Sequence, residues 1–306
     1  MKRGVWLLLG LAVVISLPVA GLAQINDDYK ELQGIIDIHT HVGPATDLSL
    51  PRTLDAIEAV QLAQRHGMRA INLKQHYLET ASWAYLVSRM VPGIKVFGGI
   101  ALNRSVGGLN VNAVEQVATF KGGFGRVVYF PTFESAFSNP KTPERSVAVS
   151  KDGALLPAVF EILKVAAKYD MAVSTGHSSP AESLMIIKAA KDAGVKRIFV
   201  QHPAMAMINM SVESQNEAVK MGALLEYVIG EALTNQKDFE HWTGLIKQVG
   251  PQNVVIGTDL GQWGRSTPTD GYKVIIPRML KAGFTQQQLD VMMKTNPARV
   301  LALEKW

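Results

Sequence analysis

The chain has 306 residues, 47% of them hydrophobic and 19% charged, so it can bury a sizeable core and is too apolar for a disordered protein. It contains no cysteine, which excludes disulfides, thiolate metal sites and cysteine nucleophiles. The formal net charge is +5, and it falls to +3 once Lys2 and Arg3 are removed with a predicted leader. That balance is too mild to indicate nucleic acid or an anionic membrane surface as a partner.

The first residues have the pattern of a secretory signal. The chain opens Met1-Lys-Arg3, carries no charge from Gly4 to Asn26, and contains the small-residue step Gly21-Leu-Ala23. This pattern predicts a signal peptide over residues 1–23 and a periplasmic or secreted mature protein with no membrane contact after cleavage. The alternative is an uncleaved anchor, because the uncharged stretch is just long enough to span a bilayer. Pro18 and the small-residue step favour cleavage.

Eight short apolar runs follow and predict strands. They are continuous rather than alternating, which is typical of strands buried on both faces of a parallel sheet. In chain order the runs lie at residues 35–38, 70–73, 95–102, 126–130, 171–174, 197–200, 223–228 and 253–256.

Helix start and stop signals separate these strands. Thr53 precedes an apolar stripe that ends at Gly67, and Ser179-Pro-Ala-Glu182 is a capping box with proline at the first helical position. Further helix starts are predicted, in chain order, at Asn112 with Glu115, at Ser211 or Ser214, at Thr285 with Gln288, and at Asn296-Pro297. One further apolar helix face consists of Phe239, Trp242 and Ile246.

Eight strand–helix units in one chain predict an α/β fold of the (β/α)8 TIM-barrel type, a single domain over residues 27–306. The alternative is an open doubly wound sheet, which the lack of a glycine-rich phosphate loop makes less favourable. One long irregular stretch, Phe133–Gly153, is typical of a lid or insertion near a site.

Polar residues collect where the predicted strands end. His39 and His41 end the first strand, His177 and His202 follow the fifth and sixth, and Asp259 follows the eighth. The carboxyl ends of all barrel strands converge on one face, so these side chains are expected in one pocket. Neutral imidazoles with a carboxylate suit a divalent metal of the zinc, manganese or iron kind.

Each of these signals alone is weak. A single His-x-His occurs by chance in many strands, and Asp259 alone is equally compatible with a helix N-cap. His66 and His241 fall in predicted helices and are expected to be solvent-facing. The ordered combination of His-x-His, His, His and Asp on four strands is far more specific.

In that order the sequence resembles the amidohydrolase superfamily of metal-dependent hydrolases, which has the (β/α)8 fold. The resemblance covers essentially all of the mature chain. Within the superfamily, the sequence is similar to an uncharacterised branch that is related to phosphotriesterase-like and decarboxylase-like members. It rests on the segments Asp37-Ile-His39-Thr-His41, Leu73-Lys-Gln-His76, Gly107-Gly-Leu-Asn110, Thr175-Gly-His-Ser-Ser-Pro-Ala-Glu182, Gln201-His202-Pro203, Gly257-Thr-Asp259 and Asn296-Pro-Ala-Arg-Val-Leu-Ala-Leu303.

The resemblance implies five metal ligands: His39, His41, His177, His202 and Asp259. It also makes Asp259 the catalytic residue that takes a proton from the attacking water. The chain departs from the pattern at the fourth strand, where two-metal members carry a bridging carbamylated lysine or a glutamate. No lysine lies there, and Glu134, a few residues late, is the candidate bridging ligand. One ion is therefore favoured over two, with zinc preferred to manganese or iron.

The predicted reaction is hydrolysis of an amide, lactone or other ester bond of a small molecule. Residues at other strand ends are candidates for holding the substrate: Lys74, His76, Arg104 and Thr132. Lys74 and Arg104 suit a carboxylate or phosphate, although either could instead pair with Glu226 or Glu134. Two alternatives are a nonoxidative decarboxylase of a small carboxylic acid and a periplasmic metal- or solute-binding protein without turnover. A homo-oligomer is compatible with all three.

Overall fold

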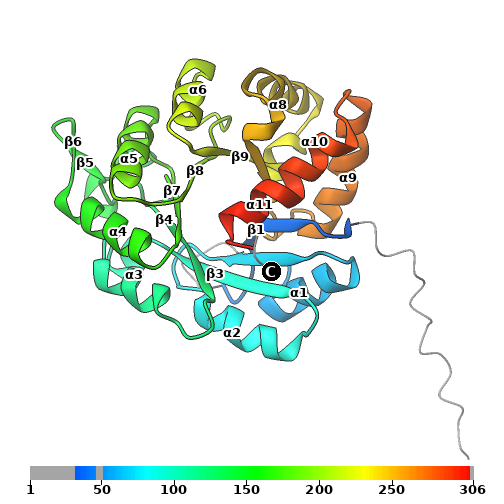
Figure 1. Cartoon of the computed structure of the whole chain (residues 1–306), viewed down its shortest axis with the longest axis horizontal. Helices are drawn as coiled ribbons and strands as arrows, with labels where there is room; N and C mark the ends of the chain where they lie inside the picture. Colours follow the sequence, from blue (N-terminus) through cyan, green and yellow to red (C-terminus); the bar gives the residue numbers. More distant parts are fainter. Residues whose placement is uncertain (1–31, 46–50, 304–306) are drawn as a thin grey trace, which may run out of the picture.

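The computed structural model describes residues 32–45 and 51–303. Eight parallel strands form the inner ring in Figure 1, and helices lie outside them. The strands pair in chain order and have these bounds: β1 Ile36–His41, β2 Ala70–Lys74, β3 Lys95–Ala101, β4 Gly125–Tyr129, β7 Ala172–Ser174, β8 Arg197–Gln201, β9 Leu224–Val228 and β10 Val254–Gly257. Each predicted run therefore forms a strand. The predicted leader, residues 1–23, lies outside the described residues.

Backbone hydrogen bonds connect the first strand to the segment that follows the last. His41 N donates to Leu260 O at 2.9 Å, and Asp259 N donates to His39 O at 2.9 Å. These bonds bring the two sheet edges together, so the sheet forms a nearly closed barrel rather than the open doubly wound alternative. The fold is the predicted (β/α)8 barrel, as a single domain.

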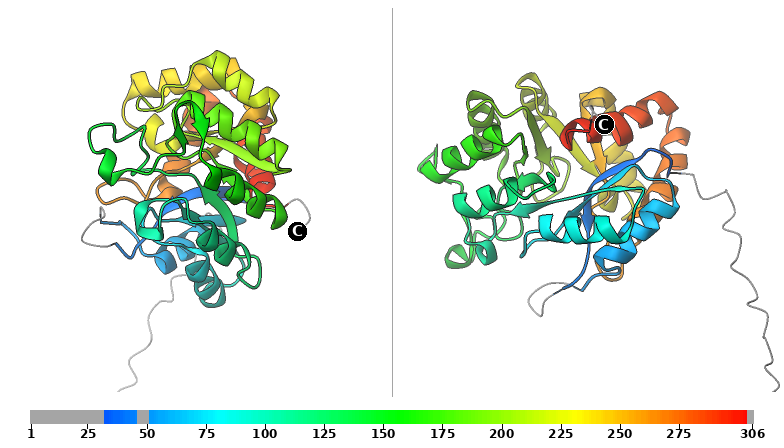
Figure 2. Two further views of the ribbon diagram at one scale, coloured as in Figure 1. Left: turned by 90° about the vertical axis from the view of Figure 1, so that its left-hand side faces the viewer. Right: turned by 60° about the horizontal axis from the view of Figure 1, so that its bottom comes forward.

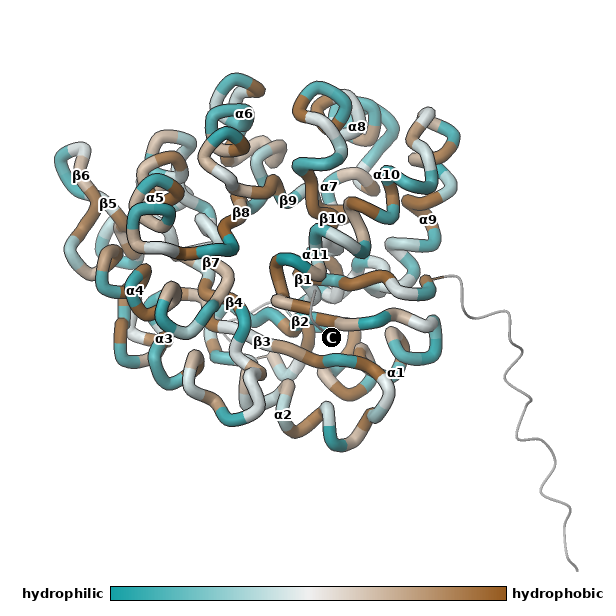
Figure 3. The backbone as a smooth tube through the Cα atoms, viewed as in Figure 1, coloured by the Kyte–Doolittle hydropathy of each residue, from teal (hydrophilic) through white to brown (hydrophobic). Residues whose placement is uncertain are grey.

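The helices surround the barrel and bury apolar residues in a core shared with the strands. Hydrophobic and hydrophilic residues are mixed along each of these helices (Figure 3). Their bounds are α1 Ala56–Arg65, α2 Ala81–Met90, α3 Val111–Ala118, α4 Pro157–Lys168, α5 Pro180–Asp192, α6 Val212–Lys220, α7 Ile229–Ala232, α8 Gln236–Val249, α9 Pro268–Lys281, α10 Gln286–Asp290 and α11 Asn296–Val300. A π-helical segment, Val291–Thr295, joins α10 to α11. No helix in residues 32–45 and 51–303 has the length and apolar character needed to cross a membrane.

The helix caps agree with the sequence at most positions. Capping boxes form at Ser179 with Glu182 and at Thr285 with Gln288, as predicted. The first helix is capped by Asp55 rather than introduced directly by Thr53, because Asp55 and Glu58 form a reciprocal box. In α3 the cap is Asn110, whose side chain accepts from Ala113 N, two residues before the predicted Asn112.

The long segment after β4 is only partly irregular. It contains a 3₁₀ turn, Pro143–Arg145, and a short hairpin of β5 Ser150–Lys151 with β6 Ala154–Leu155. Its first turn is fixed to the barrel mouth, because the Ser135 hydroxyl donates to His177 O at 2.7 Å. The insertion therefore begins beside a predicted ligand.

An inner cluster of apolar side chains fills part of the barrel interior. The residues that share this inner cluster come from the strands, such as Ile36, Ile38 and Tyr129, and from the last helix and the turn after it, Ala298–Leu303. Asn296 holds α11 in place, because its amide donates to Val254 O at 2.6 Å. The same enclosing arrangement of helices and strands is visible from two further sides in Figure 2. The barrel interior therefore holds this apolar cluster together with the buried polar residues at the strand ends, such as His39, His41 and Lys74.

Candidate metal centre

The first strand carries its two histidines into the barrel by means of an irregularity. Ile36 and Ile38 face the inner core, so strict alternation would turn His39 outward. The register between β1 and β2 shifts between Asp37 and Thr40, as in a β-bulge. This shift lets His39 and His41 both reach Asp259 inside the barrel, where the sequence predicted one shared site.

A buried carboxylate fixes the irregular turn. Asp37 accepts from His39 N at 3.0 Å and from the Thr40 hydroxyl at 2.6 Å. It also accepts from Thr258 N at 3.0 Å and from the Thr258 hydroxyl at 2.6 Å. Asp37 therefore connects the residue before Asp259 to the strand that carries both histidines.

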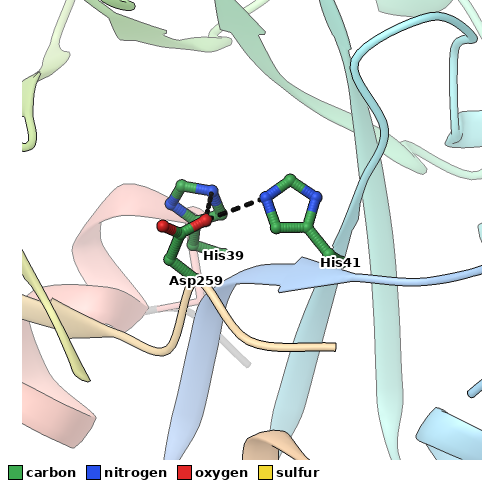
Figure 4. A group of neighbouring side chains, drawn as sticks. All are labelled: His39, His41 and Asp259. Atoms are coloured by element: carbon green, nitrogen blue, oxygen red, sulfur yellow. Dashed lines mark hydrogen bonds and ion pairs between the residues drawn. The ribbon is translucent and has the colours of Figure 1, made fainter. Parts of the chain in front are cut away.

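His39, His41 and Asp259 form one group of potential ligands (Figure 4). Asp259 Oδ1 lies 2.9 Å from His41 Nε2 and 3.1 Å from His39 Nε2. All three side chains are buried, and their ligand atoms lie within 4.8 Å of one another. Three of the five predicted ligands therefore converge on one point.

A second group shares His39 and adds His202 and Glu226. Glu226, on β9, is fully buried, and its Oε1 lies 3.1 Å from His39 Nδ1. The rings of His39 and His202 have centroids 5.2 Å apart. Gly257 leaves room for this pair, since a Cβ there would lie 3.0 Å from His39 Cβ and 3.3 Å from Glu226 Oε1.

His177 lies next to His202, with ring centroids 5.3 Å apart, but belongs to neither group of ligand atoms. The amide nitrogen of Gln201 lies 2.9 Å from His202 Nε2 and 3.4 Å from His177 Nε2. Ser174 donates to the Gln201 oxygen at 2.9 Å, which fixes the amide in this orientation. Gln201 thus contacts two imidazole nitrogens that were predicted to bind metal.

Lys74 lies inside the centre rather than at its rim. Its side chain is buried, its Nζ is 2.8 Å from His39 Nε2, and it lies over the Tyr129 ring at 4.6 Å. Burial lowers the pKa of Lys74 to about 8, although Asp259 and Glu226 act in the opposite direction. The sequence assigned Lys74 to the substrate, and the structure places it against a ligand.

The other predicted substrate-binding residues divide between the interior and the rim. His76 Nδ1 lies 2.9 Å from the Thr132 hydroxyl, and both residues are buried. The His76 ring is 4.7 Å from that of His41. Arg104 is exposed, and its backbone nitrogen donates to Glu134 at 2.7 Å. Glu134, the candidate bridging ligand, is absent from both ligand groups found in the described residues.

Burial keeps most of the imidazoles neutral. It lowers the pKa of His41 and that of His177 to about 3, and the pKa of His202 falls well below its usual value for the same reason. For His39, burial and Lys74 lower the pKa, but Glu226 and Asp259 outweigh them and raise it. Neutral imidazoles have the free lone pair that a metal ligand needs.

Asp259 stays ionised despite its burial. Burial raises its pKa, but the charge of His39 and the hydrogen bonds from His39 and His41 lower it well below the usual range. The backbone at Asp259 and at His202 is left-handed, with φ of 50° and 53°. Residues other than glycine adopt that region at a cost, and such outliers concentrate at functional sites.

The residues fit a divalent cation. Buried polar atoms without a hydrogen-bond partner among the described residues include Nδ1 of His41, His177 and His202 and Oε2 of Glu226. Orphaned atoms of this kind are rare in proteins and call for an explanation. Mixed imidazole and carboxylate donors suit zinc, manganese or iron. His39, His41 and Asp259 would hold one such ion, with His202 and Glu226 beside it.

The structure adds two residues to the centre that the sequence had not predicted as part of it, Glu226 and Gln201. For Glu226 a signal was present in the sequence, namely a glutamate within an otherwise apolar strand. His66 is buried at the end of α1, not solvent-facing, because the chain turns there toward Leu32. His241 is exposed, as expected.

Comparison with solved structures confirms the predicted resemblance at the level of the fold. An amidohydrolase from Pseudomonas aeruginosa is 13% identical, with a TM-score of 0.63 over 90% of this chain and 97% of that one. An organophosphorus hydrolase from Deinococcus radiodurans is 15% identical, with a TM-score of 0.59 over 89% and 93%. No curated protein matches the sequence.

One protein family matches most of the barrel. Its match extends over residues 34–226, from β1 to β9, and so includes four of the five predicted ligands. The chain therefore belongs to the family of unknown function DUF6282.

Proposed function

We propose that the protein is a metal-dependent hydrolase that cleaves an amide, lactone or other ester bond of a small molecule. The observation that carries this proposal is the convergence of His39, His41 and Asp259 on one buried point. The neighbouring folds named as amidohydrolase and organophosphorus hydrolase are consistent with it. We further propose a single ion, with zinc preferred to manganese or iron.

The chain's own residues supply the remaining chemistry. A divalent ion in the site would supply Lewis-acid polarisation and would acidify a water molecule. The Asp259 carboxylate, ionised and next to both histidines, accepts the proton of the attacking water and returns it to the leaving group. Lys74 places a positive charge next to His39 and can stabilise negative charge that develops on the substrate.

Elemental analysis followed by an activity panel tests the proposal. The purified protein is expected to contain a stoichiometric transition metal and to lose ester, lactone or amide hydrolysis on chelation. Re-addition of zinc, manganese or iron should restore turnover. Asp259→Asn should keep most of the metal and lose turnover, whereas the exposed control Asp192→Asn should behave like the wild type. Wild-type turnover in Asp259→Asn, or turnover without any metal, would contradict the proposal.

A decarboxylase is the second candidate, and the buried Lys74 is the observation that favours it. A cation 2.8 Å from a ligand nitrogen could hold a substrate carboxylate next to the ion. Carbon dioxide release from small carboxylic acids separates this reaction from hydrolysis. Metal without either activity would instead favour a binding protein.

The cellular location stays a proposal that rests on residues 1–23 alone. We propose export to the periplasm or beyond, with cleavage after Ala23. Amino-terminal sequencing of the protein from fractionated cells tests this: a mature chain that begins at Gln24 supports it, and an intact Met1 in the membrane fraction supports the anchor instead.

A further inference from the structure

Apolar side chains gather at the mouth of the barrel. Eleven large hydrophobic side chains are exposed among the described residues, and six of them lie on α2, α4 and α9. The other five lie on loops that follow the carboxyl ends of β2, β4, β8 and β10, the face that carries the histidines: Leu78, Phe133, Phe137, Met207 and Trp263. Every exposed large hydrophobic residue outside a helix is therefore on the face of the candidate site.

Phe133 connects this apolar rim to the buried centre. Its ring centroid lies 4.2 Å from that of His76 and 5.8 Å from that of His177. The ring centroid of His76 in turn lies 4.7 Å from that of His41, whose Nε2 is hydrogen-bonded to Asp259. Yet Phe133 is 46% exposed. Part of its ring packs on the imidazoles and part is open to solvent.

We infer that the site acts on a substrate with an apolar acyl or aryl group beside the reacting bond, and that Phe133 is the specificity-determining contact for that group. A ring that is left half-exposed against polar imidazoles gains hydrophobic contact only when an apolar ligand covers it. Trp263, 72% exposed and four residues after Asp259, adds a second exposed apolar side chain to the same face from another loop. This inference rests on the proposed function for the reacting bond, but the apolar subsite itself can be measured by binding alone.

A homologous ligand series tests the subsite without turnover. Acetate, butanoate, hexanoate and octanoate are titrated calorimetrically into the metal-loaded protein. The dissociation constant is expected to fall two- to fourfold per added methylene, since a buried methylene contributes about 0.8 kcal/mol. In Phe133→Ala this dependence on chain length should largely disappear, and in Phe133→Leu it should be largely restored.

Phe160→Ala is the matched control, because Phe160 is 44% exposed but lies on α4 and has no ring contact with a histidine among the described residues. It should retain the wild-type chain-length dependence. A flat series in the wild type, or an unchanged series in Phe133→Ala, overturns the inference. The wild type could show chain-length dependence that Phe133→Ala removes and yet hydrolyse nothing in the activity panel. That result supports the subsite and rejects only the proposed reaction.

Discussion

Removal of Asp37 should disturb both the barrel and its centre. Its carboxylate is fully buried and accepts four hydrogen bonds, two from backbone nitrogens and two from hydroxyls. In Asp37→Ala the nitrogens of His39 and Thr258 lose their partner inside the protein. A buried donor left unsatisfied costs about 1–3 kcal/mol, so the expected loss of stability is about 2–6 kcal/mol. That is a large share of the 5–15 kcal/mol typical of a domain.

Asp37→Asn should be much milder. The amide oxygen can still accept from both backbone nitrogens, and the amide nitrogen faces the hydroxyls of Thr40 and Thr258, which can rotate to accept. The Thr258 hydroxyl already has His39 O within 3.0 Å as another acceptor for its proton. Only the charge assistance is lost, so we expect a cost of about 1 kcal/mol.

Urea denaturation followed by circular dichroism measures the free energy of unfolding of both variants. EDTA is present so that bound metal does not contribute to the measured stability. Asp192→Ala, an exposed residue paired with Lys188, is the control and should change stability by less than about 0.5 kcal/mol. Equal losses in Asp37→Ala and Asp37→Asn, or a loss below about 1 kcal/mol in Asp37→Ala, would refute the reasoning.

Three further outcomes are expected. Glu226→Gln should weaken zinc binding by about 10- to 100-fold, because Glu226 orients His39 through its Nδ1; an unchanged affinity in a competitive chelator titration would exclude that role. Lys74→Met should tighten zinc binding at least about 10-fold, since an ammonium next to a ligand nitrogen repels a cation; weaker binding would instead make Lys74 a ligand. The metal-free protein should lose stability as the pH falls from 7 to 5. Because burial lowers the pKa of His41 and His177 from 6.5 to about 3, the unfolded chain binds more protons between those values, and each group contributes about 2 kcal/mol of loss by pH 5. Urea midpoints that do not fall on acidification would contradict this sign.

The sequence was sufficient for the fold because its signals are local. Continuous apolar runs and capping boxes such as Ser179 with Glu182 depend on neighbouring residues, and eight repeats of the same unit leave few topologies. The convergence of His39, His41 and Asp259 also followed, because the barrel brings all carboxyl strand ends to one face.

The rest of the site depends on register and could not be predicted in this way. Strict alternation from Ile36 would have turned His39 outward, and the Asp37 hydrogen bonds that correct it join residues 221 positions apart. Glu226 joins the centre only because β9 directs it toward His39 across the barrel. The burial of Lys74 against a ligand likewise reflects side-chain packing that no spacing rule encodes.

The inner apolar cluster of the barrel has a consequence for how the protein folds during synthesis. Residues 298–303 complete the inner cluster, and they are translated after all eight strands. A nascent chain that stops short of them has an unfilled cavity lined by Ile36, Tyr129 and their neighbours. Such a chain exposes an apolar interior until residues 298–303 have been added, which makes it a natural client for holding chaperones.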